Sequence, residues 1–189
     1  MEPWLIITLI VVAVVLILAA IVTYNGLVSK KVETENAWSQ IDVQLQRRHD
    51  LIPNLVETVK GYASHEKDTL ERVIQARNMA VNAKGVAQHA EAENVLTGAL
   101  KSLFAVAEAY PDLKANENFR ALQEELTATE NRISFSRQHY NDSVSQYNTA
   151  LMRFPANIIA SMFGFRQVEF FQLDPAEMAA VRKAPQVKF

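Results

Sequence analysis

The chain has 189 residues and a formal net charge of −2, with acidic and basic side chains mixed along its length. This balance gives no basic surface for nucleic acid and no charge excess that would favour acidic substrates. The absence of cysteine excludes disulfides, a thiol nucleophile and thiolate metal sites. Five glycines and six prolines are few for a protein rich in strands and tight turns.

The first predicted element is an apolar run from Trp4 to Tyr24 that contains no charged side chain. About 20 residues, at about 1.5 Å each, span the roughly 30 Å hydrocarbon core of a bilayer. The run is longer than the apolar core of a cleaved signal peptide, and no basic residue precedes it. We therefore predict a transmembrane anchor in residues 1–25, with Trp4 and Tyr24 at the two interfaces.

Two basic residues set the predicted orientation of this anchor. Lys30 and Lys31 follow the apolar run, whereas its N-terminal side has no lysine or arginine. The positive-inside rule then places the N-terminus outside and the rest of the chain in the cytoplasm.

Residues 26–154 read as a helical bundle, because apolar residues recur there at steps of three and four. The first stripe follows the anchor without an intervening proline or glycine between residues 28 and 40. The stripes are Trp38, Ile41, Leu45, Arg48, Ile52, Leu55, Val59 and Tyr62; Leu70, Val73, Arg77 and Val81; Val95, Ala99, Leu103, Val106 and Tyr110; and a long one from Phe119 to Phe154.

Gly85 decides how many helices these stripes make. If it interrupts the chain, the fold is all-α, with the transmembrane helix followed by an elongated antiparallel up-and-down four-helix bundle. If Gly85 is tolerated within a helix, at a cost of about 1 kcal/mol, three long helices result instead. The weak periodicity around Gly85 favours four.

Residues 155–189 form a phenylalanine-rich tail. Pro155 is expected to stop the fourth helix, and five phenylalanines lie between residues 154 and 171. Asp174, Pro175 and Glu177 provide a cap, a first-turn proline and an acidic third position, which predicts a short terminal helix that ends at Pro185.

No motif for catalysis or for a cofactor is found. His65-Glu66 begins like a zinc-peptidase motif, but Thr69 stands where the second histidine ligand would be needed. Glycine-rich phosphate loops, nucleophile elbows and paired-carboxylate motifs are absent from the sequence. We therefore predict no catalytic, cofactor or metal site, no small-molecule substrate and no enzymatic activity.

Arg48 is the charged residue on the first apolar stripe. The simpler interpretation, which we favour here, is that its stem packs in the seam while its guanidinium reaches the surface. The alternative is a buried polar layer in which Arg48 meets Glu130 or Asp50 and fixes the helix register.

Several segments closely resemble the LemA family. They are Trp38–Tyr62, Tyr110–Phe119, Thr129–Ile133, Tyr140–Asn148, Phe154-Pro155 and Phe170-Phe171. The resemblance covers nearly the whole chain and implies a single-pass, membrane-anchored helical bundle in the bacterial inner membrane. It implies no enzymatic chemistry. His49 stands where the family often has tyrosine.

The helix lengths suggest where apolar surface is left uncovered. The second and third segments would each be about 30 Å long and cover only half of a first helix of about 55–60 Å. Exposed apolar stripes of this kind usually mean association, so we predict a homo-oligomer. The residues predicted to associate are Trp38, Leu45, Val144, Tyr147 and Leu151.

The same geometry brings the tail towards the bilayer. Its phenylalanines either cap the end of the bundle core, which we slightly favour, or lie in the membrane interface. The residues concerned are Phe154, Phe163, Phe165, Phe170 and Phe171.

The sequence thus favours a membrane-anchored, non-catalytic scaffold or adaptor that self-associates, with contact between its tail and lipid left as the alternative to core capping. The alternative is an accessory subunit of a membrane enzyme, because relatives of this kind are sometimes encoded near membrane metallopeptidases. Membrane lipid, further copies of the chain and another membrane protein are the expected partners, and nucleic acid is not.

Overall fold

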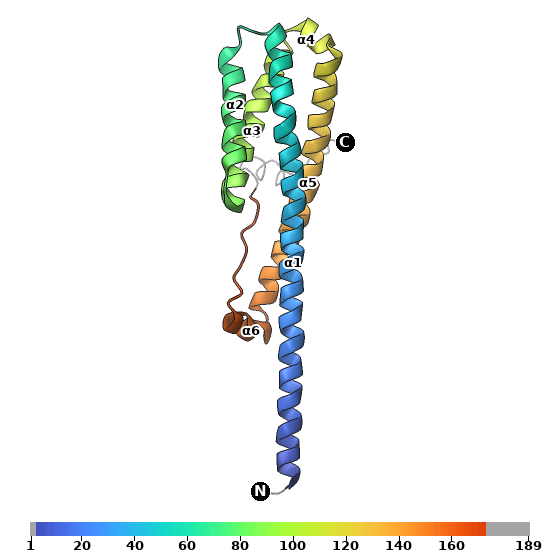
Figure 1. Ribbon diagram of the computed structural model, residues 1–189, viewed down its shortest axis with the longest axis vertical. Helices are drawn as coiled ribbons and strands as arrows, with labels where there is room; N and C mark the ends of the chain where they lie inside the picture. The colour runs from blue at the N-terminus through green and yellow to red at the C-terminus, as the bar shows by residue number, and fades with distance from the viewer. Residues whose placement is uncertain (1–2, 173–189) are drawn as a thin grey trace, which may run out of the picture. The chain divides into compact units, whose positions relative to one another are not determined.

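The computed structural model describes residues 3–172, which contain six α-helices and no strand (Figure 1). The all-α prediction is therefore confirmed. The short helix predicted from Asp174 lies outside the described residues. The helices are α1 (Pro3–Tyr62), α2 (Lys67–Asn82), α3 (Gly85–Ala107), α4 (Pro111–Ala115), α5 (Glu117–Met152) and α6 (Ala156–Phe163).

The described residues divide into two compact units, to which α1 and α5 both contribute. Residues 3–39 and 138–169 form one, here named the anchor unit, and residues 40–137 with 170–172 form the other, here named the bundle unit. The domain limits predicted after residues 25 and 154 stay a prediction.

The bundle unit is an antiparallel up-and-down four-helix bundle made from the end of α1, from α2 and α3, and from the start of α5 (Figure 1). Gly85 is the reason for four helices. It begins α3 with φ +77°, a left-handed conformation that other residues adopt only with strain. The backbone of Ala83 and Lys84 just before it is extended, so α2 and α3 are separate helices, and the three-helix alternative is wrong.

The core of the bundle unit confirms most of the stripe of α1 and the start of the stripe of α5. In α2 the stripe holds for Leu70 and Val73, but Ala76 and Ala80 are buried in its second half and Val81 is 45% exposed. Ile52, Leu55 and Val59 of α1 are buried, as predicted from their spacing. In α3, however, the buried face is Leu96, Leu100, Leu103 and Ala107. Val95, which the sequence placed in the seam, is 45% exposed. The predicted register of α3 was therefore rotated by about one residue.

The connection between α3 and α5 contains a helix that the sequence did not predict. Pro111 begins α4 at a first-turn position, where proline's missing N–H costs no helical hydrogen bond. Asn116 then caps α5, since its Oδ1 accepts a 2.9 Å hydrogen bond from the N–H of Phe119.

The anchor unit contains the apolar start of α1, the end of α5, and α6 with the segment after it. By length and composition α1 can cross a membrane, and none of its most apolar 18-residue window is buried. Leu27 of α1, Tyr147 and Leu151 of α5, and Ala160 of α6 form the core of this unit. Pro155 follows the end of α5, as predicted, but α6 begins directly after it.

Candidate functional site

A buried ionic cluster joins three helices of the bundle unit. One guanidinium nitrogen of Arg48 lies 3.1 Å from Glu93 of α3 and 3.2 Å from Glu130 of α5. The other donates to the hydroxyl of Thr97 at 2.7 Å. Nε2 of His49 lies 2.5 Å from the second oxygen of Glu93. The Arg48 and Glu93 side chains are each only 5% exposed. Both charges are therefore removed from water, and each is stabilised by the opposite charge of the other.

This cluster corrects the favoured interpretation of Arg48. The guanidinium does not reach the surface, and its contact with Glu130 agrees with the alternative of a buried polar layer. Asp50, the other carboxylate considered, instead accepts a hydrogen bond from Gln46 on its own helix. Glu93 was missed because the predicted register of α3 turned it away from the core. Its spacing of three residues from Leu96 was the signal that could have found it.

The cluster links α1, α3 and α5 through specific ionic contacts, an arrangement suited to fixing helix register. Its charged groups are paired with one another, so each is held in place by the others. Within residues 3–172, no group of three or more histidine, aspartate or glutamate side chains could hold a metal ion.

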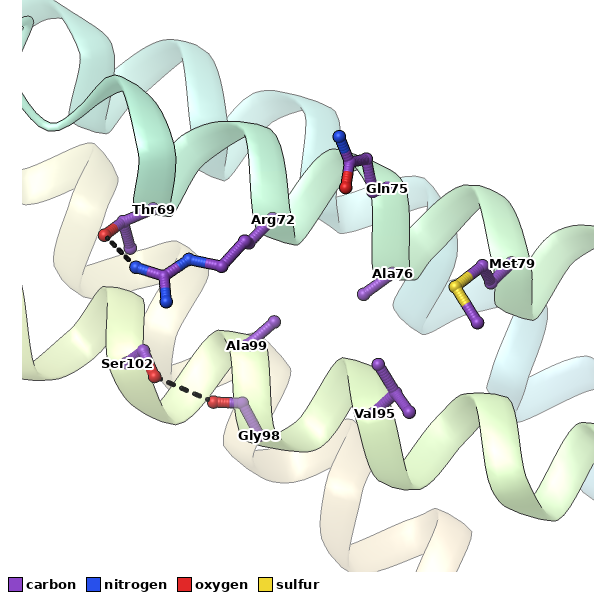
Figure 2. A pocket seen from close by; sticks show the side chains of 9 residues that line it. All are labelled: Thr69, Arg72, Gln75, Ala76, Met79, Val95, Gly98, Ala99 and Ser102. Atoms are coloured by element: carbon purple, nitrogen blue, oxygen red, sulfur yellow. Dashed lines mark hydrogen bonds between the residues drawn. The ribbon is translucent and has the colours of Figure 1, made fainter.

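A groove of about 330 Å³ lies between α2 and α3 on the bundle unit (Figure 2). Its floor is made of the small residues Ala76, Gly98 and Ala99, and its apolar rim of Met79 and Val95. Both rim residues are about half exposed. The groove therefore offers an apolar surface that no part of the bundle unit covers.

The other end of this groove is polar. Arg72 donates to the hydroxyl of Thr69 at 3.2 Å, and Ser102 donates to the carbonyl of Gly98 at 3.2 Å (Figure 2). Asp68 and Glu71 lie beside Arg72 and Gln75 around an adjoining hollow. A ligand of the groove would thus meet apolar contacts at one end and charged groups at the other.

Gly98 is the unusual residue of the groove. A glycine within a helix costs about 1 kcal/mol relative to alanine. A Cβ added to Gly98 would meet nothing within 4 Å, so packing inside the molecule does not require glycine here. The vacant space lets a partner approach the backbone of α3 closely.

The five residues predicted to self-associate are placed differently from what the sequence suggested. Val144, Tyr147 and Leu151 are buried in the anchor unit, and Leu45 is buried in the bundle unit. Trp38 is half-buried and packs edge-on against Tyr140, with ring centroids 5.5 Å apart. Tyr147 and Leu151 are covered because α6 and the segment after it pack against them. Self-association itself stays a prediction.

The phenylalanines of the tail divide into two groups. Phe165 packs against the core of the anchor unit, and Phe171 is buried in the bundle unit under the guanidinium of Arg137. Phe154, Phe163 and Phe170 are exposed. Core capping, which the sequence slightly favoured, therefore accounts for two of the five, and lipid contact by the others stays a prediction.

Both predicted ends of the membrane run are exposed or half-buried in the anchor unit. Trp4 is exposed near the start of α1. Tyr24 is half-buried, with the ring of Phe163 at 4.8 Å and that of Phe165 at 5.6 Å. The tail thus returns to the point on α1 where the apolar run ends.

The segment after α6 is held along α5 by polar side chains. Asn148 donates to the carbonyl of Val168 at 2.9 Å and accepts from its N–H at 3.0 Å. The phenol of Tyr140 donates to the carbonyl of Glu169 at 2.8 Å. These bonds satisfy the backbone of an extended segment that has no strand partner. They also fix the position of the residues between Gly164 and Val168.

Comparison with known proteins finds one family along most of this chain. The LemA family model matches residues 37–189. The chain is 28% identical to "Magnetosome protein MamQ 2" of Paramagnetospirillum magneticum, over 89% of this chain and 73% of that protein. It is 26% identical to "Magnetosome protein MamQ" of Magnetospirillum gryphiswaldense, over 86% and 70%. It is 27% identical to "Protein LemA" of Metamycoplasma hominis, over 83% and 72%.

The family match and the uncovered apolar start of α1 together describe a membrane-associated helical protein. The match begins within α1 and extends to residue 189, so it includes both the ionic cluster and the tail. Because the match covers most of the chain, the protein belongs to the LemA family.

Proposed function

We propose that this protein is a non-catalytic adaptor, anchored in the bacterial inner membrane by α1, which binds a helix of a partner protein in the groove between α2 and α3. The observation that carries the proposal is Gly98, a glycine in the middle of a helix that faces an open groove and has no packing reason inside the molecule. An amphipathic helix laid in such a groove would cover the apolar rim.

The rim and the acidic hollow define the partner's chemistry. Met79 and Val95 favour an apolar anchor side chain, and methionine adapts readily to different partners. Asp68 and Glu71 beside the polar end favour a basic residue one or two turns away. We therefore propose a helix with an apolar face and a basic end. The cytoplasmic position of the bundle, which follows from Lys30 and Lys31, is part of the proposal.

Photo-crosslinking in intact cells tests this function. A photo-reactive side chain introduced at position 79 should give an adduct heavier than the monomer, because Met79 lies on the rim. The substitution Gly98→Leu should abolish this adduct, since leucine fills the groove and favours the helix more than glycine does. Gly61→Leu is the matched control, because Gly61 also has free space around it but lies outside the groove.

The mass of the adduct separates the interpretations. An adduct with another membrane protein that Gly98→Leu abolishes supports the adaptor, and identification of a peptidase in it would define the partner as an enzyme. An adduct with twice the monomer mass would mean that the groove binds a second copy of the chain. If Gly98→Leu and Gly61→Leu gave the same adducts as the parent chain, the groove would not be the binding site.

A further inference from the structure

The anchor unit contains a second pocket, of about 590 Å³, which the adaptor proposal does not use. One wall is a single face of α1, because its residues recur at helical spacing. The opposite wall is the segment that follows α6, and one α5 residue completes the lining. The α1 residues are Tyr24, Val28, Lys31, Val32 and Glu35; the others are Tyr147 and residues 163–168.

This pocket begins where the apolar run of α1 ends. Tyr24 is the last residue of that run, and the rings of Phe163 and Phe165 both pack on it. Aromatic residues at the end of a transmembrane segment lie at the level of the lipid headgroups. A pocket lined by Tyr24 would therefore lie at the level of the lipid headgroups.

The pocket's charged groups suit an anion. Lys31 and Arg166 line it, and Arg166 forms no ion pair with any described residue. Glu35 is the carboxylate in the lining. It lies 3.8 Å from Lys31, and because both side chains are more than half exposed the pair is weak. Two cations against one carboxylate leave a net positive charge at the position of a headgroup.

Tyr147 adds a hydrogen-bond donor to the lining. Burial raises the pKa of its phenol, and the charge of Glu35 raises it further. The phenol is therefore protonated at neutral pH. Val28 and Val32 make part of the α1 wall apolar, as the glycerol and first methylene groups of a lipid require.

The neighbouring helix α6 provides an independent sign of lipid. Ala160 is buried against Leu27 of α1, whereas Ile158 and Met162 on the other side are 50% and 72% exposed. An apolar face exposed at this level of the anchor would be buried in the boundary between headgroups and acyl chains.

We propose that this pocket binds the phosphate headgroup of an anionic phospholipid from the bilayer that α1 spans, while the exposed face of α6 lies in the membrane interface. Lys31 and Arg166 contact the phosphate, and the apolar walls contact the glycerol. The inference rests on membrane anchoring and on the anchor unit, so it is independent of the groove between α2 and α3.

Native mass spectrometry of the full chain in detergent tests this site. The protein is mixed with phosphatidylglycerol or with phosphatidylcholine of the same acyl chains, and the retained lipid is counted. The parent chain should retain phosphatidylglycerol in preference. Lys31→Gln and Arg166→Gln should each weaken this retention about fivefold, the effect of one cation near an anionic lipid. Lys30→Gln is the control, because Lys30 is the adjacent residue and does not line the pocket.

Three further results decide the assignment. Lys31→Arg keeps the charge and should restore retention, which distinguishes lost charge from lost structure. Equal retention of the two lipids by the parent chain would overturn the proposal, and so would equal losses in Lys30→Gln and Lys31→Gln. Displacement of the lipid by millimolar glycerol 3-phosphate would show that the pocket takes a soluble phosphate ester, and the lipid assignment would be wrong.

Discussion

Arg77 supplies the hydrogen bond that Pro53 removes from the backbone of His49. In an α-helix the N–H of residue 53 would donate to the carbonyl of residue 49, but proline has no N–H. The side chain of Arg77, on α2, donates to this carbonyl at 2.9 Å. A proline inside α1 is thus tolerated because a neighbouring helix of the bundle unit satisfies the carbonyl it leaves unpaired.

A double-mutant cycle checks this compensation. Arg77→Leu should destabilise the protein by about 1–2 kcal/mol, because a partly buried carbonyl loses its donor. In the background of Pro53→Ala the same change should cost about 1 kcal/mol less, since the alanine N–H can donate instead. Thermal unfolding followed by circular dichroism measures both. Arg72→Leu, on the exposed side of α2, is the control, and equal costs of Arg77→Leu in both backgrounds would contradict the explanation.

Two adjacent arginines of α1 should respond very differently to the same substitution. Arg48→Met leaves Glu93 buried without its main cation and should destabilise by about 3 kcal/mol or more. Arg47→Met removes only an exposed pair with Glu125 and should change stability by less than about 1 kcal/mol. Adding Glu93→Gln to Arg48→Met should restore part of the lost stability. Unfolding in urea measures the stability of each variant, and an unchanged or raised stability of Arg48→Met would contradict the prediction.

Replacing two glycines by alanine should change the stability of the protein in opposite directions. Gly164 ends α6 with φ +72°, so Gly164→Ala forces a strained backbone and should cost about 1 kcal/mol. Gly98→Ala lies within α3, where the added Cβ meets nothing, and should gain about 0.5–1 kcal/mol. Amide hydrogen exchange measures each change in its own unit. A gain at Gly164 would mean that the left-handed turn is not needed to place Phe163 and Phe165.

Tyr140 should make the stability of the protein depend on pH in the alkaline range. Burial raises the pKa of its phenol from 10.0 to about 12, with a smaller contribution from the charge of Glu169. The folded state therefore holds this proton more tightly than the unfolded state. The stabilising contribution is fully present below pH 10 and is lost as the pH rises through about 12.

The comparison with Tyr140→Phe isolates this effect. At pH 7 the parent chain should be more stable by about 1 kcal/mol, because the phenol donates to the carbonyl of Glu169. The difference in stability between the two proteins should narrow between pH 10 and pH 12. Unfolding curves recorded at intervals over that range test it, and parallel curves for the two proteins would contradict the assigned pKa.

The fold was predictable where local signals were strong. The charge-free run from Trp4, the long stripe of α5 and the glycine at position 85 each act within a few residues. They correctly gave a long apolar N-terminal helix and a four-helix bundle. α6 was missed because eight residues after Pro155 are too few to show a helical period, and their apolar character read as an irregular tail.

The interior of the bundle was harder to predict because α3 is apolar on more than one face. Val95 and Leu96 begin two stripes that converge on Leu103, and periodicity alone does not choose between them. Which stripe is buried depends on how α3 packs against its neighbours. Glu93 is buried because it lies on the same face of α3 as Leu96. The groove at Gly98 and the pocket at Lys31 depend on contacts between segments far apart in the sequence, which no local pattern reports.

The division of the chain into units has a consequence for its synthesis. Leu27 in the anchor unit is covered by α6, which lies more than a hundred residues later. At roughly 5–20 residues per second, a ribosome needs on the order of ten seconds to make the intervening chain. Nearly all of the bundle unit emerges in that interval, so it can fold before the anchor unit is complete. Each nascent chain therefore passes through a stage in which the bundle unit is complete while the apolar surface around Leu27 of the anchor unit is still uncovered and available to a chaperone or to a neighbouring chain.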